Sequence, residues 1–377
     1  MTNLESFRKQ LEKLKLDGFI VTNHFNIFYL CGFRGISPTE REAILIFAKD
    51  PTLITASLYQ TEARRLSSTH LSIRIVKERN QIFELAKKLF KAGLPTGALA
   101  KVGFEEEDLK VSELREFKKT LSSVKLVPTK NFIEDLRIIK SAEEIKRIEK
   151  AQIISQQAFL QLLKTIKIGQ TEAEIADRLK RIIKSLGADG LAFESIVAAG
   201  PNSGKPHHLT GDRRLAVNDV LLLDFGAKYK DYCADVSRTI FVGKVDTQKQ
   251  HIWQLVAKAQ QTAIKSIITG IKASDAYYTA HGVFKDQKLH NYFLHGLGHG
   301  IGLEVHERPY LRPASPSQPN LGGPTIEDEL LGGMIFSVEP GLYFPNWGGI
   351  RIEDLVVVKN GKAKILGKLH QDIIIIC

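Results

Sequence analysis

The amino-acid sequence predicts two domains, an α/β domain over residues 1–137 and an α+β domain over residues 138–377. Length is the first indication, because 377 residues exceed the usual size of one domain. A second is that short apolar strands alternate with helices only in the first part of the chain. A third is that acids and histidines gather in strand-like segments of the second part.

The first domain is expected to begin with a helix, because Leu4, Phe7, Leu11 and Leu14 follow helical spacing. Compact apolar runs such as AILIF are typical of buried strands. Helices are predicted over 3–16, 61–66 and 80–93, strands over 18–22, 43–47 and 101–105, and the stretches 112–121 and 124–137 complete the domain.

Two amphipathic helices are expected to open the second domain, over 141–166 and 171–187. Each begins with the Ser/Thr-x-x-Glu pattern of a capping box. Gly187 marks the end of the second helix, since glycine commonly follows a helix C-terminus.

Composition favours a globular protein of a reducing compartment. The cysteines, Cys31, Cys233 and Cys377, are too few and too far apart for a disulfide framework. The first residues lack the apolar core of a signal peptide, and no apolar run has the length of a membrane span. We therefore expect a cytoplasmic protein without a membrane partner.

A net charge of +11 raises the question of a nucleic-acid partner. The basic groups, such as REFKK, are short and interleaved with acids along the chain. This pattern favours a solvated surface and no nucleic-acid site.

Residues 220–242, VLLLDFGAKYKDYCADVSRTIFV, predict a hairpin of two apolar strands around a polar turn. With the turn centred on Tyr229 and Lys230, Asp224 and Asp235 face each other about 5 Å apart. Two carboxylates this close are unfavourable unless a cation or a proton lies between them. The plainer alternative is two solvated aspartates, one at a strand end and one at a turn.

Residues 332–358 predict two further strands joined by a Pro/Gly turn, interrupted by Glu339 and Glu353. An ionised glutamate inside an apolar strand needs a partner, and Arg351 could form an ion pair with one of them. Together the two hairpins predict a cluster of four carboxylates. Metal ions are the simplest way to offset the repulsion within such a cluster.

The segment HGLGHGIGLEVHE, residues 295–307, carries His295, His299 and His306 among four glycines. A helix is disfavoured, because each glycine costs about 1 kcal/mol relative to alanine. In an extended chain His295 and His299 share a face, whereas His306 has the opposite parity. The three histidines therefore need not bind one ion.

Two loops complete the candidate regions. Residues 198–213 form a Gly/Pro-rich loop that presents His207 and His208 but lacks the spacing of a phosphate loop. Residues 308–329 are rich in proline and glycine and predict a long surface loop.

Together these segments resemble the pita-bread metallopeptidases, and they are most similar to the Xaa-Pro branch of aminopeptidase P and Xaa-Pro dipeptidase (prolidase). That family carries Asp in DxG, Asp before xxRT, His in HGxGHxxG, Glu in EPG and Glu in RxED. The stretch 22–33 also resembles the pattern N-I-x-Y-L-x-G-F of its accessory domain. The resemblance implies a creatinase/prolidase-like N-terminal domain and a pita-bread catalytic domain. The matching ligand positions, in order, are Asp224, Asp235, His299, Glu339 and Glu353.

The resemblance implies two divalent metal ions held by these five residues, with Asp235 and Glu353 as bridges. The oxygen-rich donor set favours Mn²⁺ or Co²⁺, with Zn²⁺ or Fe²⁺ as alternatives. A hydroxide that bridges the metals would attack the scissile carbonyl, and Glu339 would handle its proton.

The activity implied is that of an exopeptidase that hydrolyses the Xaa-Pro bond at the N-terminus of dipeptides or short peptides. His207 would contact the leaving nitrogen and His306 the carbonyl. His295 and Arg351 would line the pocket for the proline side or the carboxylate of the substrate. Members of the family are commonly oligomers, so a homodimer is expected; dipeptidase and aminopeptidase remain open.

Three alternative protein classes share part of this pattern. Methionine aminopeptidases share the five ligands but normally lack this N-terminal domain. Creatinase shares the domain but has lost the ligand set. A metal-free peptide- or nucleic-acid-binding module has only the positive charge in its favour.

Overall fold

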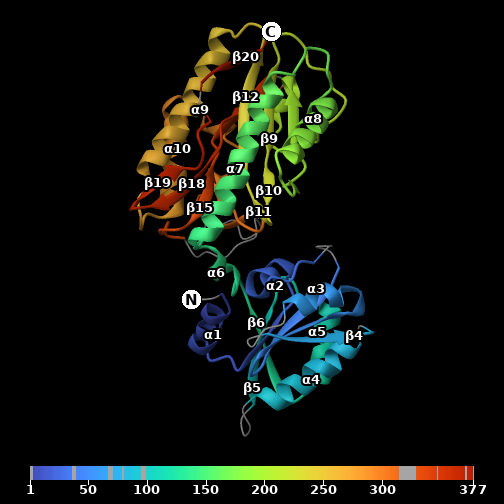
Figure 1. Cartoon of the computed structure of the whole chain (residues 1–377). Coiled ribbons are helices and arrows are strands. Elements are labelled where there is room, and N and C mark those ends of the chain that lie inside the picture. The colour runs from blue at the N-terminus through green and yellow to red at the C-terminus, as the bar shows by residue number, and fades with distance from the viewer. Residues whose placement is uncertain are drawn as a thin grey trace. The chain divides into compact units, whose positions relative to one another are not determined.

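The structure is a computed structural model that describes residues 3–35, 40–66, 71–78, 80–94, 99–313, 328–345, 347–369 and 372–376. The chain divides into two compact units, Met1–Arg137 and Ile138–Cys377, which are coloured blue to cyan and green to red in Figure 1. Within the described residues no helix is both long and apolar enough to cross a membrane.

The first unit is a six-stranded mixed sheet with helices on both faces (Figure 1). Strand β1 is buried along its whole length, because Phe19 and Val21 enter one apolar core and Ile20 the other. The first core also receives α1 (Asn3–Lys13), α2 (His24–Cys31) and α3 (Gln60–Arg65), and the second receives α4 (Gln81–Gly93) and α5 (Val111–Thr120). The strand order is β4 (Ser72–Val76), β3 (Pro51–Ala56), β2 (Ala43–Phe47), β1 (Gly18–Val21), β5 (Ala100–Glu105) and β6 (Val124–Thr129).

This architecture confirms the predicted α/β class of the first unit. The sequence patterns did not identify the helices α2, α5 and α6 (Glu134–Arg137) or the strands β3, β4 and β6. Strand β4 has an exposed face, and β6 contains a proline at the edge of the sheet, so neither has the apolar run that marked β1 and β2.

The second unit contains sheets between two pairs of helices, and its strand pairs are antiparallel except for β12 with β20 (Figure 1). Helices α7 (Ala142–Leu163) and α8 (Glu172–Ser185) pack into one apolar core, and α9 (Thr247–Ser266) and α10 (Ala273–Asp286) into another. Both predicted capping boxes are present at α7 and α8, and Gly187 adopts a left-handed conformation with φ of 88°. The α+β class is confirmed.

Two larger sheets of this unit carry the acids and histidines. One has the order β20 (Ile374–Ile376), β12 (Val236–Val242), β9 (Val220–Phe225) and β8 (Ile196–Ala199). The other has the order β14 (Glu307–Leu311), β13 (Gly298–Gly300), β15 (Ile335–Val338), β18 (Asp354–Lys359) and β19 (Lys362–Ile365). Smaller sheets join β11 (Tyr232–Cys233), β10 (Ala227–Tyr229) and β7 (Gly190–Leu191), and β16 (Gly341–Phe344) and β17 (Gly348–Arg351).

The hairpin of β9 and β12 has a different register from the predicted one. Its turn is centred on Lys230 and Asp231, both with positive φ (47° and 70°), one residue later than expected. Asp224 therefore lies opposite Ser237, and Asp235 precedes β12. The two aspartates are diagonal neighbours rather than direct partners, which still keeps them on one face of the hairpin.

The segment 332–358 also differs from the two strands expected. Strands β15 and β18 pair with each other, and between them β16 and β17 form a separate hairpin. Glu339 directly follows β15 and Glu353 directly precedes β18, so both lie at strand ends rather than within strands.

The predicted loop over 308–329 is partly wrong, because its first residues belong to strand β14, which pairs with β13. Residues 314–327 lie outside the described part of the chain. The glycine-rich segment is extended only over β13, and the register shifts between His299 and Gly300. The parity argument therefore does not reach His306.

Candidate metal centre

The structure brings together the five predicted metal ligands, which lie at or near the ends of strands from the two larger sheets. One ligand atom each of Asp235, His299 and Glu353 lies within 4.8 Å of the others, and all three side chains are buried. The His299 Nε2 atom lies 3.3 Å from Glu339 Oε1 and 3.7 Å from Asp235 Oδ2. The Asp235 carboxyl also lies against that of Asp224.

The electrostatics of this cluster favour a bound cation. Burial, together with the neighbouring carboxylates, holds the pKa of Asp235 and Glu353 well above the usual range. Burial also raises the pKa of Glu339 to about 7, although Arg351 acts in the opposite direction. Without a cation, these acids keep their protons at a pH where solvated carboxyls are ionised.

The hydrogen bonding of the cluster fits the same ligand. Asp224 Oδ1, Asp235 Oδ1 and Glu353 Oε1 are buried and have no hydrogen-bond partner among the described residues. Buried polar atoms are ordinarily paired, so three such oxygens at one place indicate a bound ligand that interacts with them, which is either a hydrogen-bond donor or a cation. Carboxylate oxygens with one imidazole nitrogen form a donor set for a hard or borderline divalent cation.

His299 is oriented as a metal ligand. Its Nδ1 atom lies 3.1 Å from the Gly300 carbonyl oxygen, which can only accept, so Nδ1 carries the proton. Burial lowers the pKa of His299, and the neutral ring directs the Nε2 lone pair toward the carboxylates. Such a hydrogen bond on the far nitrogen is typical of metal-bound histidines.

The glycines around His299 permit close packing of β13. A Cβ atom on Gly298 would lie 2.0 Å from the Ser337 carbonyl oxygen, and one on Gly300 would lie 2.1 Å from the Arg308 carbonyl oxygen. Side chains at these two positions would push the strand away from its neighbours. The alternating glycines thus set the depth at which the imidazole of His299 enters the cluster.

A buried polar network lies beside the cluster. Arg351, 3% exposed, donates from Nη2 to Asp224 Oδ2 (2.5 Å), from Nε to Ser237 Oγ (2.9 Å) and from Nη1 to the Tyr343 hydroxyl (2.8 Å). His295 Nε2 lies 2.8 Å from the same hydroxyl. The guanidinium is therefore occupied within the protein, and it orients a carboxylate of the metal cluster.

Two other predicted site histidines, His306 and His207, have side chains that are partly exposed to solvent. His306 packs its ring on that of His299 at 4.2 Å between centroids, and His207 is exposed on the loop after η2 (Gly200–Gly204). The neighbouring His208 instead contacts buried Glu172 at 2.8 Å. His207 also lies close enough to affect the pKa values of His295, His306 and Glu339 electrostatically.

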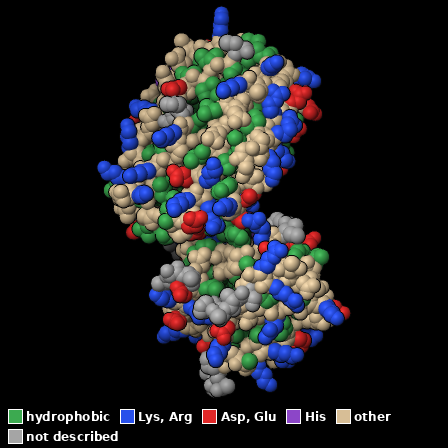
Figure 2. Space-filling model, in the orientation of Figure 1, with side chains coloured by type: hydrophobic (Ala, Val, Ile, Leu, Met, Phe, Trp, Pro, Cys, Tyr) green, Lys and Arg blue, Asp and Glu red, His purple; other side chains and the backbone are tan. Residues whose placement is uncertain are grey.

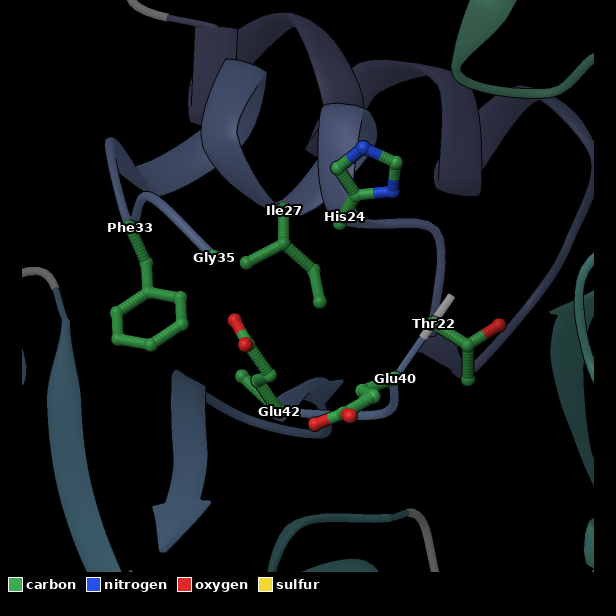
Figure 3. A pocket seen from close by; sticks show the side chains of 8 residues that line it. Thr22, His24, Ile27, Phe33, Gly35, Glu40 and Glu42 are labelled. Atoms are coloured by element: carbon green, nitrogen blue, oxygen red, sulfur yellow. The ribbon is translucent and has the colours of Figure 1, made fainter. Parts of the chain in front are cut away.

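Hollows elsewhere do not contain the predicted site residues. Figure 3 shows one in the first unit, lined by side chains that include His24, Glu40 and Glu42, and it offers only ≈ 10 Å³ to a water-sized molecule. That is room for about one water and too little for a peptide. The described residues that line an open hollow of ≈ 510 Å³ in the second unit include no acid and no histidine; they are Gly243, Lys244, Val245, Gln250, Ile373 and Ile375.

The surface gives no competing charged site on the face shown in Figure 2. There Lys and Arg side chains are spread over both units and alternate with acidic and apolar ones. This distribution is typical of a solvated surface.

Sequence patterns missed three residues that the structure places around the candidate site: Ser237, Tyr343 and Glu172. Each acts through tertiary contacts, with Glu353, with Arg351 and His295, and with the His207 loop respectively. A polar residue within a buried strand is the only signal that would have marked Ser237 and Tyr343.

Comparisons with known proteins agree with this geometry. Residues 146–360 match Metallopeptidase family M24, and residues 3–139 match the Creatinase/Prolidase N-terminal domain. The Xaa-Pro dipeptidase of Pyrococcus furiosus is 32% identical over 371 residues, which are 98% of this chain and 99% of that protein. Among solved structures, an Xaa-Pro dipeptidase from Bacillus anthracis has a TM-score of 0.88 at 30% identity and 99% coverage of both chains. An X-Pro aminopeptidase from Thermotoga maritima has a TM-score of 0.87 at 29% identity, with each chain covered completely.

Proposed function

The chain belongs to metallopeptidase family M24, and from that premise we propose that it is an exopeptidase that hydrolyses the Xaa-Pro bond at the N-terminus of dipeptides or short peptides. The observation that supports the proposal is the cluster of four buried or largely buried carboxylates and one imidazole, in which three oxygens have no hydrogen-bond partner among the described residues. Relatives named Xaa-Pro dipeptidase and X-Pro aminopeptidase that match over nearly the whole chain supply the substrate class.

Two divalent cations are the proposed cofactors, held by Asp224, Asp235, His299, Glu339 and Glu353, with Mn²⁺ or Co²⁺ preferred by the hard donor set. Bound there, the ions would supply Lewis acidity to polarise a carbonyl group and to make water a nucleophile near neutral pH.

Glu339 is the proposed proton carrier of the site. Its side chain is 15% exposed and accepts a 3.1 Å hydrogen bond from Ser337 Oγ. In the metal-free protein burial raises the pKa of Glu339 to about 7, and a cation bound beside it would lower that pKa. A carboxylate in this position can accept the proton of the attacking water and return it.

His306 is the proposed donor to the substrate carbonyl. Partial burial of the ring and the adjacent His299 lower the pKa of His306 to about 4, so its ring is a neutral N–H donor. A neutral donor placed beside the cluster stabilises the charge that develops on the carbonyl oxygen.

His207 is the proposed partner of the leaving nitrogen. Proline forms a tertiary amide without an N–H group, so its nitrogen must gain a proton as the bond breaks. An exposed histidine on the loop beside the site can supply that proton. His295 and Arg351 shape the proline side of the pocket from beneath, through the Tyr343 hydroxyl and Asp224.

The test is release of the N-terminal residue from Xaa-Pro and Xaa-Pro-Yaa peptides after metal removal and readdition of Mn²⁺ or Co²⁺. Activity on the dipeptide alone would identify a dipeptidase, and activity on the tripeptide an aminopeptidase. No release from either peptide with any divalent metal would refute the proposal. The expected homodimer is tested separately by sedimentation equilibrium.

A further inference from the structure

A buried carboxylate lies beneath the loop that carries His207. Glu172 is the first residue of α8 and is 1% exposed. Its Oε1 atom accepts hydrogen bonds from the Ala199 backbone N–H (2.8 Å) and the Asn202 side-chain amide (2.9 Å). Its Oε2 atom accepts from the His208 ring (2.8 Å) and the Gly211 backbone N–H (3.1 Å). All four donors belong to one segment, residues 199–211.

The bonds to Glu172 are charge-assisted. Burial alone would raise the pKa of Glu172, but the hydrogen bonds from the loop outweigh it, and the pKa is lowered. The carboxylate is therefore ionised, which makes His208 Nε2 the donor of its bond. Hydrogen bonds to an ionised acceptor are roughly twice as strong as neutral ones.

Glu172 is not needed to cap its own helix. The first turn of α8 is capped by Thr171 and Glu174, whose side chains and backbone N–H groups bond reciprocally. The Glu172 side chain is directed to the loop instead. Its loss should therefore loosen the loop and leave the cap of α8 in place.

His207 itself has little to fix it. It is exposed, and no hydrogen bond from its ring to another described residue is present. Beyond Glu172, the loop is held where Ser203 Oγ accepts from the Gly349 N–H (2.9 Å) and where Arg351 donates to the Pro206 carbonyl (3.3 Å). The position of the imidazole is thus set by its neighbours on the loop.

We propose that Glu172 is a positioning residue for the reaction, which holds both ends of segment 199–211 so that His207 meets the leaving nitrogen. The inference rests on the proposed function. It assigns Glu172 no contact with substrate or metal, so its effect must pass through His207. Displacements of about 1 Å in a reacting group can cost about 100-fold in rate.

A double-mutant cycle tests this with Xaa-Pro hydrolysis by the metal-loaded full chain. E172Q should lower kcat by about 10- to 100-fold with a smaller change in KM and unchanged metal content. In the H207A background the same substitution should change kcat less than about 2-fold, because the group it positions is already gone. E174Q is the matched control: it changes a glutamate of the same helix turn that does not touch the loop, and it should retain wild-type kcat.

Other outcomes overturn the inference. Equal losses of kcat from E172Q with and without H207A would show a general structural effect. A wild-type kcat in E172Q would show that Glu172 does not position a reacting group, and a wild-type kcat in H207A would show that His207 is not one. If E172Q does not fold, N202A replaces it, since that change removes one donor and leaves the carboxylate with three; the same non-additivity with H207A is then required. A wild-type enzyme inactive on every Xaa-Pro peptide would instead refute the proposed function, and the inference with it.

Discussion

Replacing Tyr343 with phenylalanine removes one hydroxyl from beneath the metal centre, where the side chain is 1% exposed. His295 Nδ1 lies 2.7 Å from the Gly296 carbonyl oxygen and so carries the proton. Burial lowers the pKa of His295 to about 3, so the ring is neutral and Nε2 is an acceptor. The Tyr343 hydroxyl therefore donates to His295 and accepts from Arg351.

The magnitude follows from the hydrogen bonds that Y343F would remove. His295 Nε2 would lose its hydrogen-bond partner, whereas Arg351 Nη1 would keep the Pro206 carbonyl oxygen at 3.3 Å. A buried polar group left without a partner costs about 1–3 kcal/mol, so the second unit should lose about that much stability. Because Arg351 also holds Asp224 at 2.5 Å, its displacement should disturb the cluster. We expect kcat/KM to fall about 10- to 100-fold, as for other partners of metal ligands.

Urea unfolding followed by tryptophan fluorescence measures the stability lost in Y343F, and it reports on the second unit. The chain has two tryptophans, Trp253 and Trp347, and both lie in the second unit. Y278F is the control, because Tyr278 is 47% exposed, and such a surface change should stay within about 0.5 kcal/mol. If Y343F unfolds at the same urea concentration as Y278F and keeps wild-type kcat/KM, the assigned network does not support the site.

Three further predictions concern the cluster itself. In the metal-free protein Glu339 has a pKa of about 7, against 4.5 in the unfolded chain. Its protonation therefore adds up to ~3 kcal/mol to the free energy of unfolding below pH 4.5, and this contribution is lost as pH rises through 7. Melting in EDTA should occur at a lower temperature at pH 8 than at pH 6, and the opposite order would contradict the assignment. H299A should lose both bound metal and turnover, whereas H306A should lose turnover only, as measured by elemental analysis and peptide hydrolysis; metal loss in H306A would place that ring among the ligands. G298A should lower stability by several kcal/mol, because its Cβ would lie 2.0 Å from a backbone oxygen of β15. The control is G282A in helix α10, where an added Cβ meets no atom within 4 Å, and it should stabilise by up to about 1 kcal/mol. Equal unfolding midpoints for the two variants would argue against the close approach at Gly298.

The five candidate ligand residues could be picked out from the sequence because each stands in a short motif beside an apolar strand, and the structure places them close together. Their exact pairing could not. The turn after β10 places Lys230 and Asp231 in left-handed conformations, which no local pattern required of a lysine. The turn therefore lies one residue later than predicted, and the residue opposite Asp224 shifts by two, from Asp235 to Ser237. The face shared by Asp224 and Asp235 was nevertheless predicted, because the diagonal neighbour lies on the same side as the direct one.

The supporting contacts were beyond reach of the sequence for a different reason. Tyr343 and Arg351 are separated by a hairpin, and Glu172 lies 36 residues before His208. Motifs with fixed spacing cannot show such pairs, because the contact depends on how sheets and helices pack. Arg351 was expected to face substrate, whereas its bonds in the structure go to protein atoms, and only tertiary packing determines that choice.

Arg351 was also the basis of the simplest alternative to a metal, an ion pair with Glu339 or Glu353. In the structure its closest carboxylate is Asp224, and the adjacent acid Asp354 pairs with Arg238 at 2.7 Å. Within the described ranges, no Lys or Arg forms an ion pair with the three remaining acids of the cluster, and the neutral ring of His299 carries no charge to offset them. Three buried carboxyls then need either protons or cations. Protons would satisfy the cluster only below the raised pKa values, whereas divalent cations also use the buried oxygens that lack a donor. The ion-pair alternative therefore accounts for one carboxylate of the four, and a metal centre accounts for all of them.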